Sequence, residues 1–154
     1  MTILKNDFQT ITSTDKGSYT KFDVKANDGV VLVVTDGIQY YLVNAERDNG
    51  NSIEFARGWV RDGETIDTAV ARLANVKLGV TYIRGIHELG NPVKLDNSWI
   101  DQDVHFVLVD VENMGNGFSD DVWSINMDKL VELLAVTTDS YSLMAYTKLL
   151  VSKN

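Results

Sequence analysis

The feature that most constrains this chain is a helical apolar pattern that lies between segments patterned for strands. Five apolar residues recur at steps of three and four positions, namely Ile66, Ala69, Val70, Leu73 and Val76. This spacing predicts a helix over 65–77 with one apolar stripe. Thr65 is placed to cap its start, and Gly79 is placed to end it. Because only one face is apolar, the helix has to pack against neighbouring strands.

The segments on both sides of this helix carry strand patterns. Val30–Val34 is a continuous, mostly β-branched run, which suits a strand buried on both faces. Asp36-Gly37 then favours a hairpin into a strand over 38–43. Further strands are predicted over 19–25, 80–84, 104–111 and 122–125, and helices over 127–135 and 141–151, the last with Leu143, Tyr146, Thr147 and Leu150 on one side. This order predicts an α/β (α+β) fold, with a mixed β-sheet sandwiched between helices. The length of 154 residues predicts a single domain, 1–154.

Charge and composition exclude several classes of function. The 22 acidic and 14 basic residues give a net charge of -8, which argues against nucleic-acid and membrane partners, since both bind clustered cations. The absence of cysteine excludes thiol catalysis and thiolate zinc sites. His87 and His105 have no second ligand at metal spacing, so they predict no metal site. Without a signal-peptide pattern or an apolar run of roughly 20 residues, we expect a cytoplasmic protein.

Glycine, glutamate and arginine residues around the predicted helix resemble the Nudix box. The family pattern is a glycine, five residues, a glutamate, seven residues, and then Arg-Glu-aliphatic-x-Glu-Glu-x-Gly-aliphatic. Five residues lie at the required offsets: Gly58, Glu64, Arg72, Gly79 and Val80. The resemblance implies the Nudix fold and, for active members, hydrolysis of a nucleoside diphosphate linked to another moiety.

The flanking segments resemble the ADP-ribose pyrophosphatase branch of that family. Residues 54–58, Glu-Phe-Ala-Arg-Gly, are similar to the Glu-Leu-Pro-x-Gly that leads into the box. Arg47 lies where that branch has the last arginine of an Arg-Gln-Tyr-Arg segment, and Asp121-Val-Trp123 precedes a leucine-rich helix as it does there. Relatives in this branch commonly dimerise through N-terminal strands, which implies a homodimer formed through residues of about 1–26.

The box departs from the family pattern where active members bind metal. Those members present glutamates at three positions spaced i, i+3 and i+4 on one helical face, where they hold Mg²⁺ or Mn²⁺. In this chain the three positions are Leu73, Val76 and Lys77. Leucine and valine cannot ligate a metal, and an ammonium group repels one. The sequence therefore predicts no catalytic residue, no metal ligand and no cofactor.

Three hypotheses of function follow. In the first, an inactive Nudix-like domain binds a nucleoside diphosphate derivative or a partner, and Lys77 holds the diphosphate directly, helped by Arg47 and Arg57. The candidate ligand-binding residues are Arg47, Glu54, Arg57, Gly58, Glu64, Arg72, Lys77, Asp120 and Asp121. In the second, the chain is an active hydrolase that holds Mg²⁺ or Mn²⁺ with Glu54, Glu64, Asp120, Asp121 or the carbonyl of Arg57. In the third, Leu73 and Val76 form an apolar patch that a partner or a second copy buries.

Purely structural roles stand beside these hypotheses. Glu64 and Arg72 would pair across the loop and the helix and hold the shape of the box. Glu54 would support the loop, and Asp120 and Asp121 would be turn residues.

Overall fold

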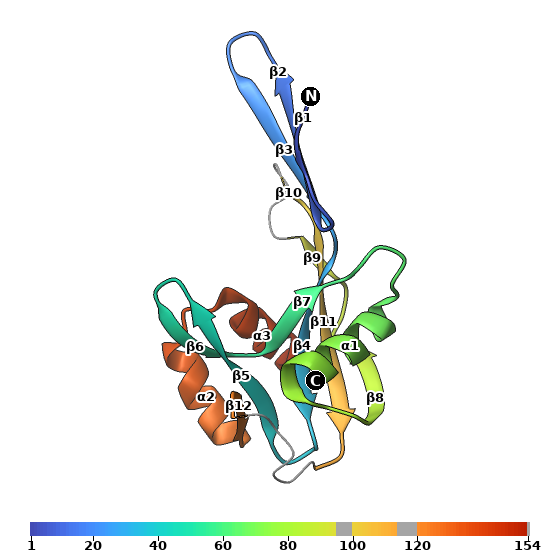
Figure 1. The fold of residues 1–154 in the computed structure, drawn as a ribbon. Coiled ribbons are helices and arrows are strands. Elements are labelled where there is room, and N and C mark those ends of the chain that lie inside the picture. The colour runs from blue at the N-terminus through green and yellow to red at the C-terminus, as the bar shows by residue number, and fades with distance from the viewer. Residues whose placement is uncertain (95–99, 114–119, 154) are drawn as a thin grey trace.

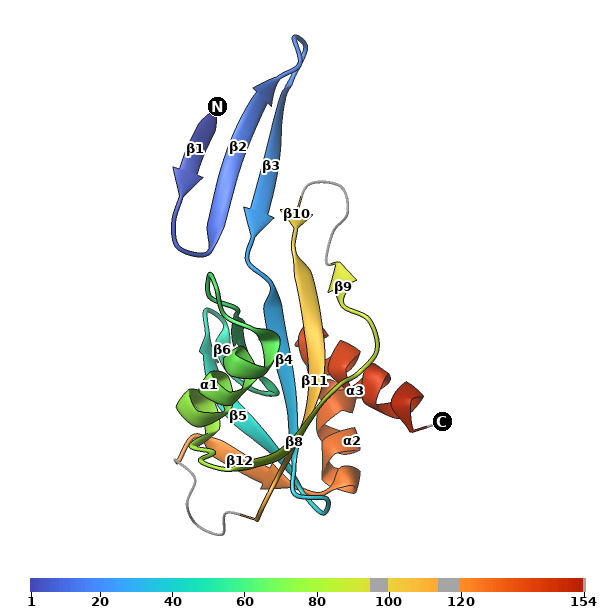
Figure 2. The ribbon, with the colours of Figure 1, turned by 90° about the vertical axis from the view of Figure 1, so that its right-hand side faces the viewer.

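The structure, a computed structural model, describes residues 1–94, 100–113 and 120–153, and arranges its strands in two sheets (Figures 1 and 2). The smaller sheet has the order β1-β2-β3-β10 and consists of β1 (Thr2–Lys5), β2 (Gln9–Asp15), β3 (Thr20–Ala26) and β10 (Ile100–Asp101). The larger sheet has the order β12-β5-β4-β11-β8, with β6 on β5, β7 on β4 and β9 on β11. It consists of β4 (Gly29–Thr35), β5 (Tyr40–Arg47), β6 (Gly50–Glu54), β7 (Ala56–Trp59), β8 (Ile83–Glu88), β9 (Val93–Lys94), β11 (Asp103–Val111) and β12 (Val122–Ile125).

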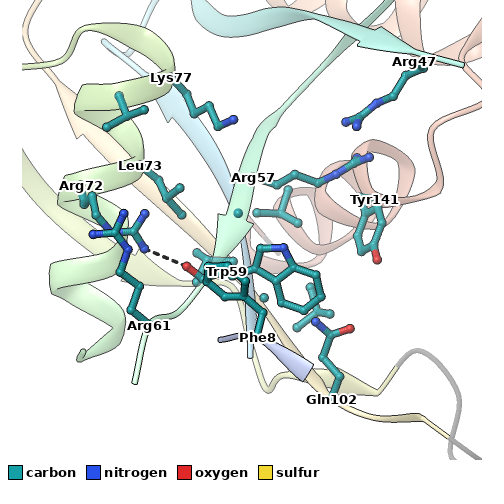
Figure 3. A pocket seen from close by; sticks show the side chains of 16 residues that line it. Phe8, Arg47, Arg57, Trp59, Arg61, Arg72, Leu73, Lys77, Gln102 and Tyr141 are labelled. Atoms are coloured by element: carbon teal, nitrogen blue, oxygen red, sulfur yellow. Dashed lines mark hydrogen bonds between the residues drawn. The ribbon is translucent and has the colours of Figure 1, made fainter. Parts of the chain in front are cut away.

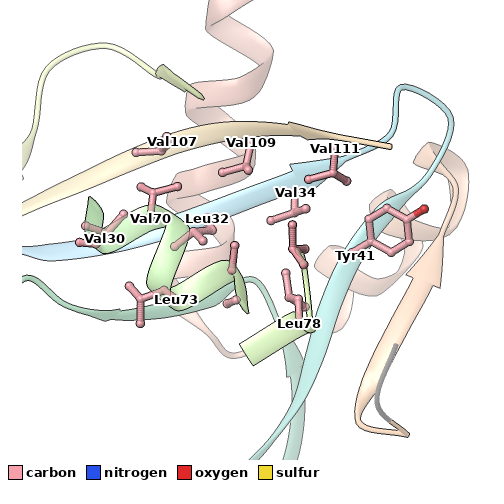
Figure 4. Packing of buried hydrophobic residues seen from close by; sticks show 14 of the residues in the cluster. Val30, Leu32, Val34, Tyr41, Val70, Leu73, Leu78, Val107, Val109 and Val111 are labelled. Atoms are coloured by element: carbon pink, nitrogen blue, oxygen red, sulfur yellow. The ribbon is translucent and has the colours of Figure 1, made fainter. Parts of the chain in front are cut away.

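The larger sheet is covered by helices on both faces. Every residue of β4 is buried, as predicted for a strand enclosed on both sides. Its alternate side chains divide between two cores because successive residues of a strand point to opposite faces. Val30, Leu32 and Val34 pack with α1 (Ile66–Leu78), whereas Val31 and Val33 pack with α2 (Met127–Val136) and α3 (Ser140–Ser152). Figure 4 shows the first of these cores between α1, β4 and β11.

The two sheets share a pair of strands that run through both. β3 continues into β4, and β10 continues into β11, with parallel pairing in each sheet. Residues Asn27 and Asp28, between β3 and β4, therefore form the junction between the sheets. Asn27 fixes it, because its side-chain amide donates to the backbone oxygen of Val60 at 3.0 Å and to Asp62 at 3.1 Å. The smaller sheet projects away from the helices (Figure 2).

The hairpin predicted at Asp36-Gly37 is confirmed by the antiparallel pairing of β4 with β5. The strand predicted over 80–84 begins later than expected. Val80, the first residue of the predicted strand, belongs to the C-terminal cap of α1. The amide of Gly79, at φ 73°, donates to Asn75, and the amide of Val80 donates to Ala74. β8 therefore begins only at Ile83.

Leu143, Thr147 and Leu150 lie on one exposed side of α3, and another side of the helix packs against the sheet. Ser142, Ala145 and Leu149 are the buried residues, while Leu143 and Leu150 are each 42% exposed. The Ser142 hydroxyl accepts a hydrogen bond from the amide of Phe55 at 3.1 Å, and this contact turns the small residues toward the sheet. None of the helices described is long and apolar enough to cross a membrane.

Candidate functional site

The loop that leads from β7 into α1 is clamped by one ion pair. The guanidinium of Arg72 donates to both carboxylate oxygens of Glu64, at 2.7 and 2.8 Å, and to the backbone oxygen of Trp59 at 2.8 Å. The amide of Arg61 donates to the same carboxylate at 2.9 Å. The hydrogen bonds from Arg72, and then from Arg61, lower the pKa of Glu64 from 4.5 to about 2. The pairing of Glu64 with Arg72 across loop and helix is thus confirmed.

Helix α1 presents Leu73, Val76 and Lys77 in three different environments. The helix begins after Thr65, whose hydroxyl accepts a hydrogen bond from the amide of Thr68, close to the predicted start. Leu73 is buried, with 3% of its surface exposed, and packs against Gly58. Val76 is 70% exposed. Lys77 is exposed and lines a cavity beside the helix.

These residues do not fit the Mg²⁺ or Mn²⁺ that the Nudix resemblance implies. Both ions take hard oxygen ligands, mainly carboxylates. Among residues 1–94, 100–113 and 120–153, no group of three His, Asp or Glu side chains is placed to hold a metal ion. The helix offers a buried isobutyl group (Leu73), an exposed isopropyl group (Val76) and an ammonium (Lys77), and none of these can replace a carboxylate ligand.

The cavity beside α1 has a volume of about 440 Å³ and is rich in cations. Its described lining includes no acidic side chain but five basic ones: Arg47, Arg57, Arg61, Arg72 and Lys77. In Figure 3, Lys77 reaches from α1 and Arg47 from β5 toward the space in front of β7, which carries Arg57. Within the described part of the chain, Lys77 has no hydrogen-bond or ion-pair partner, so its ammonium is available to a ligand.

Two of these arginines are held in place by acids that lie behind them. Glu54, only 2% exposed, forms ion pairs with Arg47 and, at 3.5 Å, with Arg57. Arg57 also donates to Asp139 at 2.6 Å, and its guanidinium lies 4.4 Å from the centre of the Tyr141 ring. Burial raises the pKa of Asp139, but hydrogen bonds from Ser142 and Arg57 lower it more, so the carboxylate stays charged. The arginines therefore sit in fixed positions with one edge toward the cavity.

Aromatic and amide side chains complete the cavity. Phe8, which follows β1, stacks with Trp59 at 6.0 Å between ring centroids. Gln102, 8% exposed, donates to the backbone oxygen of Asn27 at 3.0 Å. No sequence pattern predicted a role for Phe8 or Gln102, because they lie outside the box and reach the cavity only through the junction of the sheets.

The structure places the nine predicted ligand-binding residues in three groups. Five line the cavity: Arg47, Arg57, Gly58, Arg72 and Lys77. Glu54 and Glu64 do not line it but support its arginines. Asp120 and Asp121 are exposed outside it, and the backbone oxygen of Asp121 accepts from Asn44 at 2.8 Å where β12 begins. The last two therefore occupy a turn, as the structural interpretation predicted.

Comparisons with known proteins bear on the fold. No protein-family model and no curated protein sequence matches the chain. Among solved structures, the crystal structure of an ADP compounds hydrolase superposes with a TM-score of 0.68, over 97% of this chain and 88% of the hydrolase, at 13% sequence identity. The chain has the Nudix fold. At this identity the similarity establishes the fold alone.

Proposed function

We propose that this chain binds a nucleoside diphosphate derivative without hydrolysing it. The observation that carries the proposal is the position of Lys77, which lines the cavity and has no ion-pair partner among the described residues. It lies on the helical face where active Nudix proteins present carboxylates. Arg47 and Arg57 line the same cavity, held by Glu54 and Asp139. Fixed guanidinium groups recognise phosphate oxygens well because their paired N–H donors match the geometry of the anion.

The rest of the cavity supports a ligand with a ring as well as a phosphate. Its volume lies in the range usual for small-molecule sites, and Phe8, Trp59 and Tyr141 provide aromatic surface. The similar fold of an ADP compounds hydrolase favours the same class of ligand. Loss of hydrolysis follows from the helix, because its three substituted positions provide no carboxylate to hold the metals that ready the attacking water.

Calorimetry with ADP-ribose and ADP tests this function. We expect saturable binding, and we expect Lys77→Ala to weaken it at least about tenfold, as loss of a charge-assisted hydrogen bond does. Lys129→Ala is the matched control, since Lys129 is an exposed lysine on α2 that pairs with Glu132 outside the cavity. Binding that does not respond to Lys77→Ala contradicts the proposal.

An active hydrolase with unusual metal ligands is the second candidate. It depends on Glu54, Glu64, Asp120 and Asp121, yet the two glutamates are engaged by arginines and the two aspartates lie outside the cavity. These contacts favour binding over hydrolysis. Turnover of ADP-ribose at high Mn²⁺ that is abolished by Glu64→Gln would reverse that preference.

A partner surface containing Leu73 is contradicted, because Leu73 is buried inside the chain's own fold. The smaller sheet offers a better surface for binding a second copy of the chain. Register places one row of apolar residues across its four strands: Leu4, Ile11, Val24 and Ile100. Phe22, 50% exposed, extends this row, while the opposite face carries Lys5, Thr10, Lys25 and Asp101. We therefore propose a homodimer formed through this apolar face, since none of the described helices covers it (Figures 1 and 2).

A further inference from the structure

The charge of the cavity opposes the metal that accompanies diphosphates in active Nudix proteins. Five basic side chains line it, and the acids near it are already engaged: Glu54 by Arg47 and Arg57, Glu64 by Arg72, and Asp139 by Arg57. A metal ion that enters with a ligand would face the positive charge of these side chains. It would find no carboxylate to bind it among the described lining residues. Charges of like sign repel each other, so a metal ion is disfavoured in this cavity.

A magnesium-bound diphosphate differs from the free diphosphate in the two respects that matter here. The metal removes two negative charges from the ligand, and it occupies the phosphate oxygens that Lys77, Arg47 and Arg57 would otherwise bind. Mg²⁺ also retains a rigid shell of oxygen ligands. The isopropyl group of Val76 and the ammonium of Lys77 cannot contribute to that shell.

On the basis of the ligand class proposed above, we propose that this cavity selects the metal-free form of a diphosphate and that Mg²⁺ opposes binding by chelating the ligand. This reverses the metal dependence of active Nudix proteins. The lysine takes the place of the metal as the positive partner of the diphosphate. The bound fraction then falls as free Mg²⁺ rises.

The first test measures the dissociation constant of ADP by calorimetry, in EDTA and in saturating Mg²⁺ at matched ionic strength. We expect Mg²⁺ to weaken binding at least about tenfold, because charge-assisted hydrogen bonds to phosphate oxygens are lost. The penalty should be smaller for ADP-ribose, whose diphosphate lacks the more strongly charged terminal phosphate and chelates Mg²⁺ less. An equal penalty for the two ligands overturns chelation as the cause.

The second test restores acids at the helix. Val76 and Lys77 are both exposed, so the double variant Val76→Glu/Lys77→Glu adds carboxylates without changing the core. We expect it to bind ADP more tightly with Mg²⁺ than without, which reverses the sign of the effect. Lys129→Glu changes a lysine to a glutamate outside the cavity and should keep the wild-type response. Circular dichroism of each variant checks its fold.

The outcomes separate this inference from the function on which it rests. Binding that Mg²⁺ strengthens or leaves unchanged in the wild-type chain overturns the inference alone. A lack of binding of both ligands in both media overturns the proposed function and the inference with it. A double variant that still binds better in EDTA shows that the helix does not set the metal preference, which also overturns the inference.

Discussion

At the scale of single residues, the burial of Leu73 says most about the site. Leu73, which the sequence resemblance aligns with a metal-binding glutamate, belongs to the core around β4 and β11. Leu73 is 3% exposed and packs against Gly58. A carboxylate introduced at this position would be buried, whereas one introduced at Val76 or Lys77 would be exposed to solvent.

We predict that Leu73→Glu lowers the free energy of unfolding by about 3 kcal/mol or more, since it removes a buried side chain and buries an unpaired charge. Urea unfolding followed by circular dichroism measures the change. Leu73→Met, which nearly conserves volume, should cost less than about 1.5 kcal/mol. Equal stability of the glutamate and methionine variants would contradict the burial of this side chain.

The Glu64–Arg72 pair predicts a pH-dependent contribution to stability. The folded-state pKa of Glu64, about 2, lies below its ordinary value of 4.5. The pair therefore stabilises the fold fully above about pH 4.5, and this stabilisation is lost as the pH falls toward 2. We expect Glu64→Gln to lower the melting temperature at pH 6 and the difference from wild type to shrink steadily toward pH 2. A difference that stays constant over this range would show that the carboxylate is not paired.

At the scale of elements, close contact between β7 and α1 sets the shape of the site. A Cβ atom built on Gly58 overlaps a methyl group of Leu73. Strand and helix can approach this closely only because position 58 is a glycine. The contact positions α1, and with it Lys77, against the strand that carries Arg57.

A double-mutant cycle measures this contact. We expect Gly58→Ala to destabilise the chain by about 1–3 kcal/mol through overpacking. Leu73→Ala removes the methyl groups that clash, so the alanine at position 58 should cost at least about 0.5 kcal/mol less in that background. Denaturant unfolding of the four proteins gives the coupling free energy. Additive effects would mean that the strand and the helix are not in contact here.

Elements with a sequence pattern of their own were predictable, and four short strands were not. β4 and α1 carry continuous or helical patterns that packing alone can satisfy, and the structure confirms both. The short strands β6, β7, β9 and β10 are held by pairing with longer neighbours rather than by patterns of their own. The orientation of α3 depends on a hydrogen bond between Ser142 and Phe55, which are far apart in sequence.

The candidate site shows the same division. Arg47, Arg57 and Lys77 were predicted because they lie in or beside a motif with fixed spacing. Phe8 and Gln102 reach the cavity through tertiary contacts at the sheet junction, about which local sequence carries no information. The role of Glu54 as a buried support for two arginines likewise depends on burial, which spacing does not reveal.

At the scale of the whole molecule, an acidic chain encloses a basic cavity. The net charge is -8, yet five basic side chains converge on one space. The acids around them neutralise the arginines from behind rather than facing the cavity. Net charge therefore describes the chain as a whole and does not describe this cavity, and the acidity of the chain is compatible with the small phosphate ligand that we propose.

The last prediction concerns the oligomeric state of the chain and rests on the smaller sheet. One of its faces is apolar from Leu4 to Ile100, and solvated apolar faces of this kind favour association. We expect a dimer in sedimentation velocity, and we expect Phe22→Asp to weaken it at least about tenfold, since a charge would be buried at the interface. Thr14→Asp introduces the same charge on the opposite face and should leave the dimer intact. A monomeric wild-type chain, or a dimer that tolerates Phe22→Asp, would contradict association through this face.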